Sequence, residues 1–288
     1  MTNPVTTIGS SKESSSTEKP SRLYLVGIGP GDHAYLAPAA KQALADASDW
    51  VAYQLYLDLL AELGTDKKHH DLPLGAEIER ARLALELTLR GNTTALISSG
   101  DIGIYAMATL VFELLDSEFC PQAQRIEIEV VPGISAVQMA AARAGAPLGH
   151  DFCTISLSDL LTPWETIETR LHAAGQGDFV TAFYNPVSRQ RDWQLAHAQS
   201  VLLQYRPTNT PVVIARNLGR DDETVTITTL QELDPSRVDM LTLVLVGNSE
   251  SRLLEGGRWV YTPRGYRKKL SANTASSKQT ENQEENCL

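Results

Sequence analysis

The sequence has few cysteines, few aromatic side chains and no long apolar run. Its three cysteines, Cys120, Cys153 and Cys287, have neither the CxxC spacing nor any other spacing of metal ligands, so neither a disulfide framework nor a metal site is expected. A reducing compartment, and with it a cytoplasmic location, is the expectation that follows. No stretch approaches the ~20 apolar residues that a membrane-spanning helix needs. The N-terminus also lacks the basic flank and apolar core of a secretory signal.

The sequence also has fewer basic than acidic side chains. The chain carries 25 Lys and Arg against 35 Asp and Glu, a net charge of −10. Such a chain has no field that would steer it to nucleic acid or to an anionic membrane, so neither is expected as a partner. If the ligand is itself anionic, cations must gather locally to bind it. With 288 residues, 42% of them hydrophobic, the chain can build one large or two ordinary domains.

The composition along the chain predicts two domains between two tails. Residues 1–20 are rich in Ser and Thr, and the polar segment 267–288 ends the chain, so both are expected to be disordered. Between them we expect an N-terminal α/β domain over 21–147 and a C-terminal α/β domain over 148–266. The segment 145–149, Gly-Ala-Pro-Leu-Gly, is the candidate hinge.

Strands and helices alternate in the first half, which predicts a mostly parallel sheet with helices on its faces. Leucines at alternate positions in 75–90 fit a strand, but the helix-forming composition of that segment favours a helix. Consecutive strands late in the second half predict a mixed sheet there. The expected strands are 23–26, 49–53, 94–97, 126–131, 153–156, 179–183, 212–215, 224–228 and 241–246; the expected helices are 39–47, 75–90, 103–115, 135–144, 163–174 and 188–205.

Four turns that follow predicted strands carry unusual residues: 27–32, 98–101, 132–136 and 184–186. Turns at the carboxyl ends of parallel strands form the usual ligand crevice of open α/β sheets, so these turns are the candidate site. The first turn does not fit a dinucleotide fingerprint, because Asp32 stands where GxGxxG needs glycine and Pro30 lacks the N–H that a pyrophosphate would bind. No acidic residue follows the second strand to hold a ribose. A Rossmann-type cofactor site is therefore not expected.

Each turn also has a purely structural interpretation. The first can be a tight glycine turn, Asp101 can cap the helix that follows it, and Ser135 can cap the next helix. His69 and His70 are adjacent, a spacing that indicates a solvated loop rather than a metal pair, and no nucleophile–histidine constellation is evident. The residues alone therefore indicate a two-domain α/β protein with a ligand crevice between its domains, and an enzyme rather than a scaffold.

The turns taken together resemble the tetrapyrrole methylase family. The similarity extends from about Leu23 to Tyr266 and includes Gly-Ile-Gly-Pro-Gly-Asp at 27–32, Ser-Gly-Asp-Ile-Gly-Ile-Tyr at 99–105 and Val-Val-Pro-Gly-Ile-Ser-Ala at 130–136. Ile102 stands where many members have proline. Three further segments, 183–189, 215–220 and 239–249, resemble the branch that methylates carbon 17 of precorrin-3B and contracts its ring.

The resemblance implies two α/β domains with S-adenosylmethionine in the cleft between them, usually in a homodimer. It implies a tetrapyrrole substrate, either precorrin-3B or its cobalt form, with Gly31 and Asp32 on the tetrapyrrole side. The cofactor contacts that it implies are Pro30, Ser99, Gly100, Asp101, Ile104, Ser135, Ala136, Tyr184, Asn185 and Asn217.

Methyl transfer to an electron-rich ring needs alignment rather than a protein nucleophile. Ring contraction also removes a proton from a ring hydroxyl, and the candidate bases near the cleft are Asp32, Asp101 and Tyr184, unless the methylated substrate rearranges unaided. The carboxylates of the substrate would need local cations; the candidates are Arg189 and Arg216, with Arg191 and Arg220 as further possibilities. Two alternatives stay open: an enzyme of the same fold acting on another precorrin carbon, on ribosomal RNA or on diphthine, and a non-catalytic ligand sensor.

Overall fold

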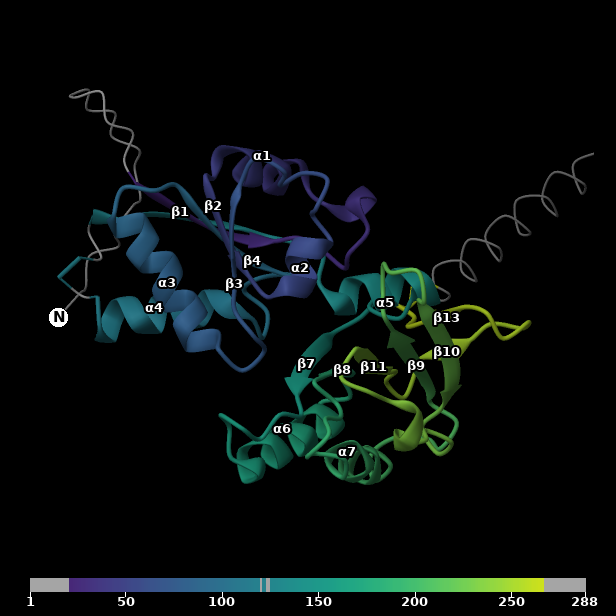
Figure 1. The fold of residues 1–288 in the computed structure, drawn as a ribbon. Helices are drawn as coiled ribbons and strands as arrows, with labels where there is room; N and C mark the ends of the chain where they lie inside the picture. Colours follow the sequence, from purple (N-terminus) through teal and green to yellow (C-terminus); the bar gives the residue numbers. More distant parts are fainter. Residues whose placement is uncertain (1–20, 120, 123–124, 267–288) are drawn as a thin grey trace, which may run out of the picture.

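Five parallel strands form the sheet of the first half, in the order β3-β2-β4-β1-β5 (Figure 1). The computed structural model describes residues 21–119, 121–122 and 125–266, so both predicted tails lie outside the described residues. The strands are β1 (Arg22–Gly27), β2 (Asp49–Ala52), β3 (Lys68–Asp71), β4 (Thr94–Ser98) and β5 (Glu127–Val131).

Helices cover both faces of this sheet, which explains why its central strands are buried throughout. Alternate side chains of β1 enter opposite cores: Leu23 and Leu25 pack under α3 (Glu77–Leu89) and α4 (Met107–Ser117), whereas Tyr24 and Val26 pack under α1 (Pro38–Asp46) and α2 (Gln54–Asp58). A strand with two covered faces reads as a continuous apolar run, as β1 and β4 do. The expected parallel sheet and the helix over 75–90 are confirmed.

The second half has a mixed five-stranded sheet, as expected, in the order β10-β9-β11-β8-β7. Its strands β7 and β8 are parallel, and the other neighbours are antiparallel. One face packs on α6 and α7, and the opposite face packs on α5. The elements are β7 (Phe152–Ser156), α6 (Trp164–Gln176), β8 (Val180–Tyr184), α7 (Gln194–Leu202), β9 (Pro211–Arg216), β10 (Thr224–Thr229) and β11 (Thr242–Val246), with α5 at Ala136–Ala144.

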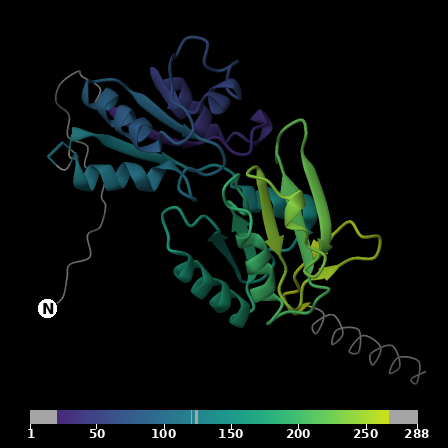
Figure 2. The ribbon, with the colours of Figure 1, turned by 60° about the horizontal axis from the view of Figure 1, so that its bottom comes forward.

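The chain passes between the halves just before α5, which packs on the second sheet although it follows the last strand of the first (Figure 2). After α5, β6 (Gly145–Ala146) joins a small sheet with β13 (Val260–Tyr261) and β12 (Arg252–Leu253). The predicted hinge at 145–149 therefore holds a strand. The division at residue 147 stays a prediction, and the packing of α5 favours a division nearer residue 135.

Three local expectations are corrected by the structure. Residues 69 and 70 lie in the edge strand β3, where His69 stacks on Trp50 and His70 Nε2 lies 2.8 Å from Asp49 Oδ1, rather than in a loop. The helix expected from 103 begins at Met107, because Tyr105 has a left-handed φ of 51°. The helix expected from 188 begins at Gln194, because Ser188 and Arg191 pair as an isolated bridge. Among the described residues, no helix is long and apolar enough to cross a membrane.

Candidate functional site in the cleft between the two halves

Three loops meet where the neighbouring strands β4, β1 and β5 end. Gly29 and Gly100 exchange both backbone hydrogen bonds, at 3.0 and 2.7 Å, which joins the first loop to the second. Gly27 and Gly133 approach so closely that a Cβ on Gly133 would lie 2.1 Å from the Gly100 carbonyl oxygen and 2.7 Å from Gly27. Backbone therefore packs directly on backbone, and glycine is needed at the point of contact.

Asp101 fastens the second loop to the third. Its Oδ1 accepts a hydrogen bond from the Gly103 N–H at 2.8 Å, and its Oδ2 accepts one from the Gly133 N–H at 3.1 Å. Charge-assisted bonds of this kind are stronger than neutral ones. Both carboxylate oxygens are thus engaged by backbone amides, one of them from a loop that follows a different strand.

The second half contributes three strand ends that are also neighbours, because β11 lies between β9 and β8. Asn185 follows β8 and Asn217 follows β9, and both have left-handed backbone, with φ of 49° and 50°. Asparagine tolerates this conformation better than most residues. The Asn217 N–H donates to the Leu241 carbonyl oxygen at 3.1 Å, which fixes the segment before β11 beside it.

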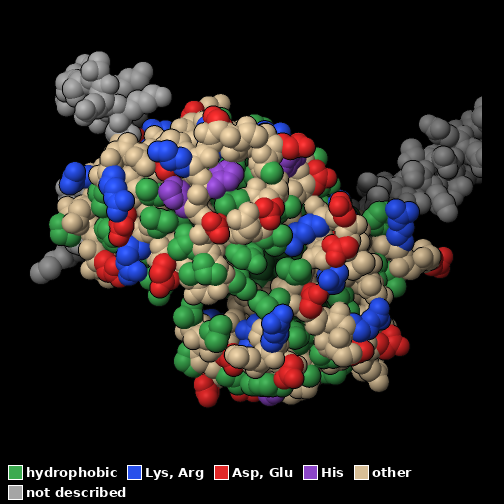
Figure 3. Space-filling view, viewed as in Figure 1, with side chains coloured by type: hydrophobic (Ala, Val, Ile, Leu, Met, Phe, Trp, Pro, Cys, Tyr) green, Lys and Arg blue, Asp and Glu red, His purple; other side chains and the backbone are tan. Residues whose placement is uncertain are grey.

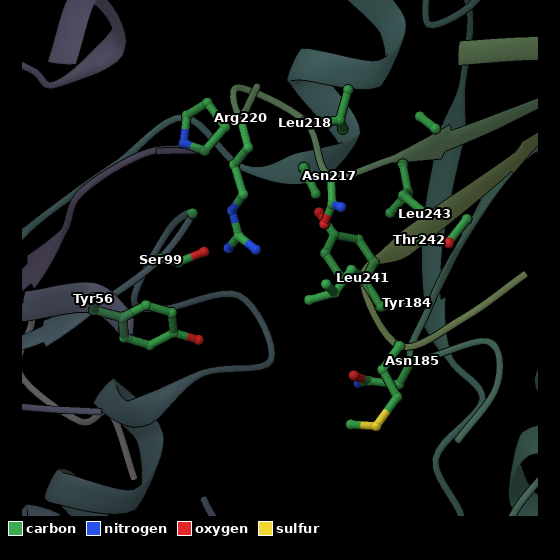
Figure 4. Close-up of a pocket in the computed structure, with 15 residues that line it drawn as sticks. Tyr56, Ser99, Tyr184, Asn185, Asn217, Leu218, Arg220, Leu241, Thr242 and Leu243 are labelled. Carbon is green, nitrogen blue, oxygen red and sulfur yellow. The ribbon is translucent and has the colours of Figure 1, made fainter. Parts of the chain in front are cut away.

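The ends of these strands enclose a cavity between the halves, and Figure 3 shows hydrophobic side chains around the hollow. The enclosed part of the cavity has a volume of about 210 Å³, and the space with the open mouth included is about 750 Å³, so the site is a cleft open to solvent. The lining residues, several of them labelled in Figure 4, are Pro30, Tyr56, Ser99, Gly100, Ala136, Tyr184, Asn185, Ala215, Asn217, Leu218, Arg220, Met240, Leu241, Thr242 and Leu243.

One side of the cavity is closed by direct contact between the halves. A Cβ on Gly219 would lie 2.9 Å from the ring of Pro30, and a Cβ on Gly31 would lie 3.1 Å from the Gly219 carbonyl oxygen. The loop that carries Gly219 is held by Glu223, which accepts from the Gly219 N–H at 2.7 Å and forms an ion pair with Arg143 of α5.

Residues 22–234 match the family model described as Tetrapyrrole (Corrin/Porphyrin) Methylases. The chain belongs to the tetrapyrrole methylase family. Over 244 residues, 85% of this chain and 99% of the relative, it is 45% identical to the probable cobalt-factor III C(17)-methyltransferase of Salmonella typhimurium. It is 41% identical over 247 residues, 85% of this chain and 96% of the relative, to the precorrin-3B C(17)-methyltransferase of a Sinorhizobium species.

Three further similarities bear on the extent of the match. The cobalt-factor III methyltransferase of Priestia megaterium is 42% identical over 252 residues, 88% of this chain, but this chain spans only 46% of that protein. The crystal structure of the methyltransferase CobJ superposes with a TM-score of 0.78 at 39% identity, over 84% of this chain and 99% of that chain. A uroporphyrin-III C-methyltransferase from Thermus thermophilus, complexed with S-adenosylhomocysteine, shares the fold at 22% identity and a TM-score of 0.57.

The methylase cavity brings together seven of the ten predicted cofactor contacts: Pro30, Ser99, Gly100, Ala136, Tyr184, Asn185 and Asn217. The other three, Asp101, Ile104 and Ser135, are not in its lining. Ser135 is 2% exposed and lies at the N-cap of α5, the structural role that the sequence also allowed for it. Ile104 is 38% exposed.

Tyr184 completes the cap of α5. Its hydroxyl accepts from the Val137 N–H at 3.1 Å and shares a hydrogen bond with Ser135 Oγ at 2.5 Å. Burial raises the pKa of Tyr184, so the hydroxyl stays protonated in the neutral range. A protonated phenol that already accepts a backbone N–H is poorly suited to remove a proton from substrate.

Of the residues predicted to contact the substrate, Arg220 lines the cavity, and Gly31, Asp32, Arg189, Arg191 and Arg216 lie outside the lining. Asp32 is exposed and its carboxylate accepts from the Ala34 N–H at 2.8 Å, which caps the short helix at His33–Tyr35. Arg216 is engaged by Asp239 at 2.7 Å and Asp222 at 3.2 Å. Arg189 is exposed, and Arg191 is buried, with its guanidinium donating to the Asn185 carbonyl oxygen. Gly31 lies against Arg220.

Several lining residues were not singled out as contacts by the sequence. Tyr56, from α2, carried no signal, because it belongs to none of the four turns. The segment 239–249, which supported the resemblance, contains Met240, Leu241 and Thr242. These residues lie at the start of β11, which pairs with β8 and β9, and that position could have identified them as lining residues. Among the described residues, no group of three or more His, Cys, Asp or Glu side chains could hold a metal ion.

Removing the Tyr184 hydroxyl should weaken the fold. Tyr184→Phe leaves the buried Val137 N–H without its acceptor, and we expect the free energy of unfolding to fall by about 1–2 kcal/mol in urea titrations. Tyr105→Phe is the matched control: its hydroxyl donates to the Thr154 carbonyl oxygen from a side chain that is 50% exposed, so water can replace it. An equal loss in both variants would contradict the capping role.

Neutralising Asp32 should have little effect on turnover. Asp32→Asn keeps an oxygen that can accept from Ala34, and the side chain faces solvent outside the lining. We expect the rates of methyl transfer and ring contraction to stay within about threefold of wild type, since efficient general-base catalysis would contribute ~100-fold or more. A hundredfold loss of contraction with methyl transfer retained would instead make Asp32 the base.

Proposed function

We propose that this methylase transfers a methyl group from S-adenosylmethionine to carbon 17 of precorrin-3B, or of its cobalt form, and contracts the ring to give precorrin-4 in cobalamin biosynthesis. The observation that carries the proposal is the cavity between the two halves. The ends of three neighbouring strands from each half meet there, and the intact motif loops that follow these strands form its walls. The two relatives at 41–45% identity that match over nearly their whole length are named for methylation at C(17) of a tetrapyrrole of this kind.

The lining fits an adenosyl ligand. Leu218, Leu241 and Leu243 give it apolar walls, and Asn217 Oδ1 is a buried acceptor without a hydrogen-bond partner within the described part of the chain. An orphaned buried acceptor carries a desolvation cost that a ligand N–H would remove. We propose that Asn217 and its neighbours hold the heteroaromatic base, and that the glycine loops hold the remainder of the cofactor.

In the proposed reaction the cofactor supplies an electrophilic methyl group, and the electron-rich macrocycle attacks it. The protein acts by alignment, which can contribute up to about 7–11 kcal/mol to lowering the barrier. The loops at Gly29, Gly100 and Gly133 are mutually hydrogen-bonded or in backbone contact, so their carbonyl groups are fixed before any ligand binds. Preorganised dipoles of this kind stabilise charge without reorganising during the reaction.

Ring contraction is proposed to need little help from a protein base. Asp101 has both oxygens occupied by backbone N–H groups, Tyr184 is held protonated, and Asp32 lies outside the lining. These positions support rearrangement driven by the methylated substrate itself. We further propose a homodimer in the cytoplasm as the working form.

The test is an anaerobic incubation of purified protein with S-adenosylmethionine and either precorrin-3B or its cobalt form, read by mass spectrometry and absorbance. We expect a gain of one methyl group with the spectral change of a contracted ring. Calorimetry with S-adenosylhomocysteine separates the alternatives. Binding without turnover of either tetrapyrrole would indicate another substrate within the family, and absence of binding would indicate a ligand sensor.

A further inference from the structure

Among the described residues that line the cavity, only Arg220 has a side chain that is charged at neutral pH. Its Nε is buried without a hydrogen-bond partner, and within the described segments no carboxylate lies at ion-pair distance from it. Arg216, four residues earlier, is by contrast engaged by two carboxylates. A partly buried guanidinium without an anion is costly, because burial disfavours the charge that it always carries.

The position of Arg220 is built by both halves of the molecule. The backbone N–H of Arg220 donates to the Asn217 carbonyl oxygen at 3.1 Å. The Glu223 carboxylate holds the same turn by accepting from the Gly219 N–H. The Arg220 side chain lies on Gly31, where a Cβ would come within 3.3 Å of Arg220 Cγ. The glycine at position 31 therefore leaves the space in which the arginine lies.

Two hydroxyl groups face the same space from the first half. Figure 4 shows the Arg220 guanidinium pointing into the cavity beside the Ser99 hydroxyl, with Tyr56 below it. Burial raises the pKa of Tyr56, so its hydroxyl remains a hydrogen-bond donor at neutral pH. A guanidinium and two hydroxyl donors form a set that matches a carboxylate, for which arginine is the preferred partner.

We propose that Arg220, with Tyr56 and Ser99, is a carboxylate-binding subsite assembled across the cleft. The inference rests on the proposed function, which offers two carboxylates for this place: that of the amino-acid portion of the cofactor and one on the periphery of the tetrapyrrole. In a chain of net charge −10, capture of either carboxylate requires a local cation that no carboxylate of the described residues already pairs with, and Arg220 is such a cation.

The first arm of the test measures cofactor affinity by calorimetry for Arg220→Gln and wild type. The probes are S-adenosylhomocysteine, which has the carboxylate, and methylthioadenosine, which lacks the whole amino-acid portion. If the cofactor carboxylate occupies the subsite, the variant binds S-adenosylhomocysteine at least about tenfold more weakly and methylthioadenosine as wild type does. Arg170→Gln, an exposed arginine of α6, is the matched control for loss of charge and should bind both as wild type does.

The second arm titrates precorrin-3B into the same proteins in the presence of S-adenosylhomocysteine. If the substrate carboxylate occupies the subsite, cofactor affinity is unchanged and tetrapyrrole affinity falls at least about tenfold, with partial recovery in Arg220→Lys. Unchanged affinities in both arms, or an equal loss for both nucleosides, would overturn the inference while the proposed function stands. Failure of the wild-type protein to bind either nucleoside would instead overturn the proposed function and, with it, the subsite.

Discussion

Gly133→Ala should abolish cofactor binding and strongly destabilise the protein. The added Cβ would lie 2.1 Å from the Gly100 carbonyl oxygen and 2.7 Å from the Gly27 carbonyl, and these atoms are backbone of two other strand ends. They cannot move aside as a flexible side chain could. Overpacking of cores costs about 1–3 kcal/mol where side chains can yield, so we expect a loss of about 4 kcal/mol or more in the free energy of unfolding.

The measurement is urea unfolding followed by calorimetry with S-adenosylhomocysteine. Gly100→Ala is the informative comparison, because its φ of 68° imposes backbone strain while the nearest atom to the new Cβ would be 4.0 Å away. That variant should lose only about 1–2 kcal/mol. If Gly133→Ala were as stable as Gly100→Ala, the close meeting of the three loops would be wrong.

Asp101→Ala should have the second largest effect. The substitution removes the acceptor of two backbone N–H groups, and it releases the loop that carries Gly133 from the loop that carries Gly103. Hydrogen bonds to a charged group contribute about 1.5–3 kcal/mol each. We therefore expect the free energy of unfolding to fall by about 3 kcal/mol and the affinity for S-adenosylhomocysteine to fall at least about tenfold.

The same substitution tests whether Asp101 is a base. A residue that acted only as a proton acceptor would change the pH dependence of ring contraction and leave stability and cofactor affinity nearly intact. The structure predicts the opposite pattern, with lower stability, weaker binding and an unaltered pH profile for whatever turnover remains. A stable Asp101→Ala protein that binds cofactor normally would contradict the fastening role.

Much of the fold could be predicted from local signals. Continuous apolar runs indicated the strands β1 and β4, and helix-forming residues decided the ambiguous segment that became α3. Turns rich in glycine and proline indicated where the site lies, because such turns follow parallel strands at one edge of a sheet. The short edge strand β3 was missed, since Lys-His-His-Asp has no apolar pattern and is held by pairing with β2 and by the Asp49–His70 contact.

The roles of individual side chains were harder to predict, because they depend on contacts far apart in sequence. Asp101 bonds to Gly133, 32 positions away, and Tyr184 caps α5 from 47 positions away. From spacing alone, Asp101 could either bind a ligand or cap a helix, and neither role includes its hydrogen bond to a second loop. Arg220 was one of the candidate cations from its place after a motif of the second half, but its contact with Gly31 in the other half is not encoded by any local pattern.

The central claim is that one cleft performs both methyl transfer and ring contraction. It is tested most directly by an anaerobic single turnover with S-adenosylmethionine labelled with carbon-13 in its methyl group, followed by NMR and mass spectrometry of the product. We predict a single labelled methyl group on carbon 17 of a product whose ring is already contracted. A label on another carbon, or a methylated product with its ring intact, would contradict the claim.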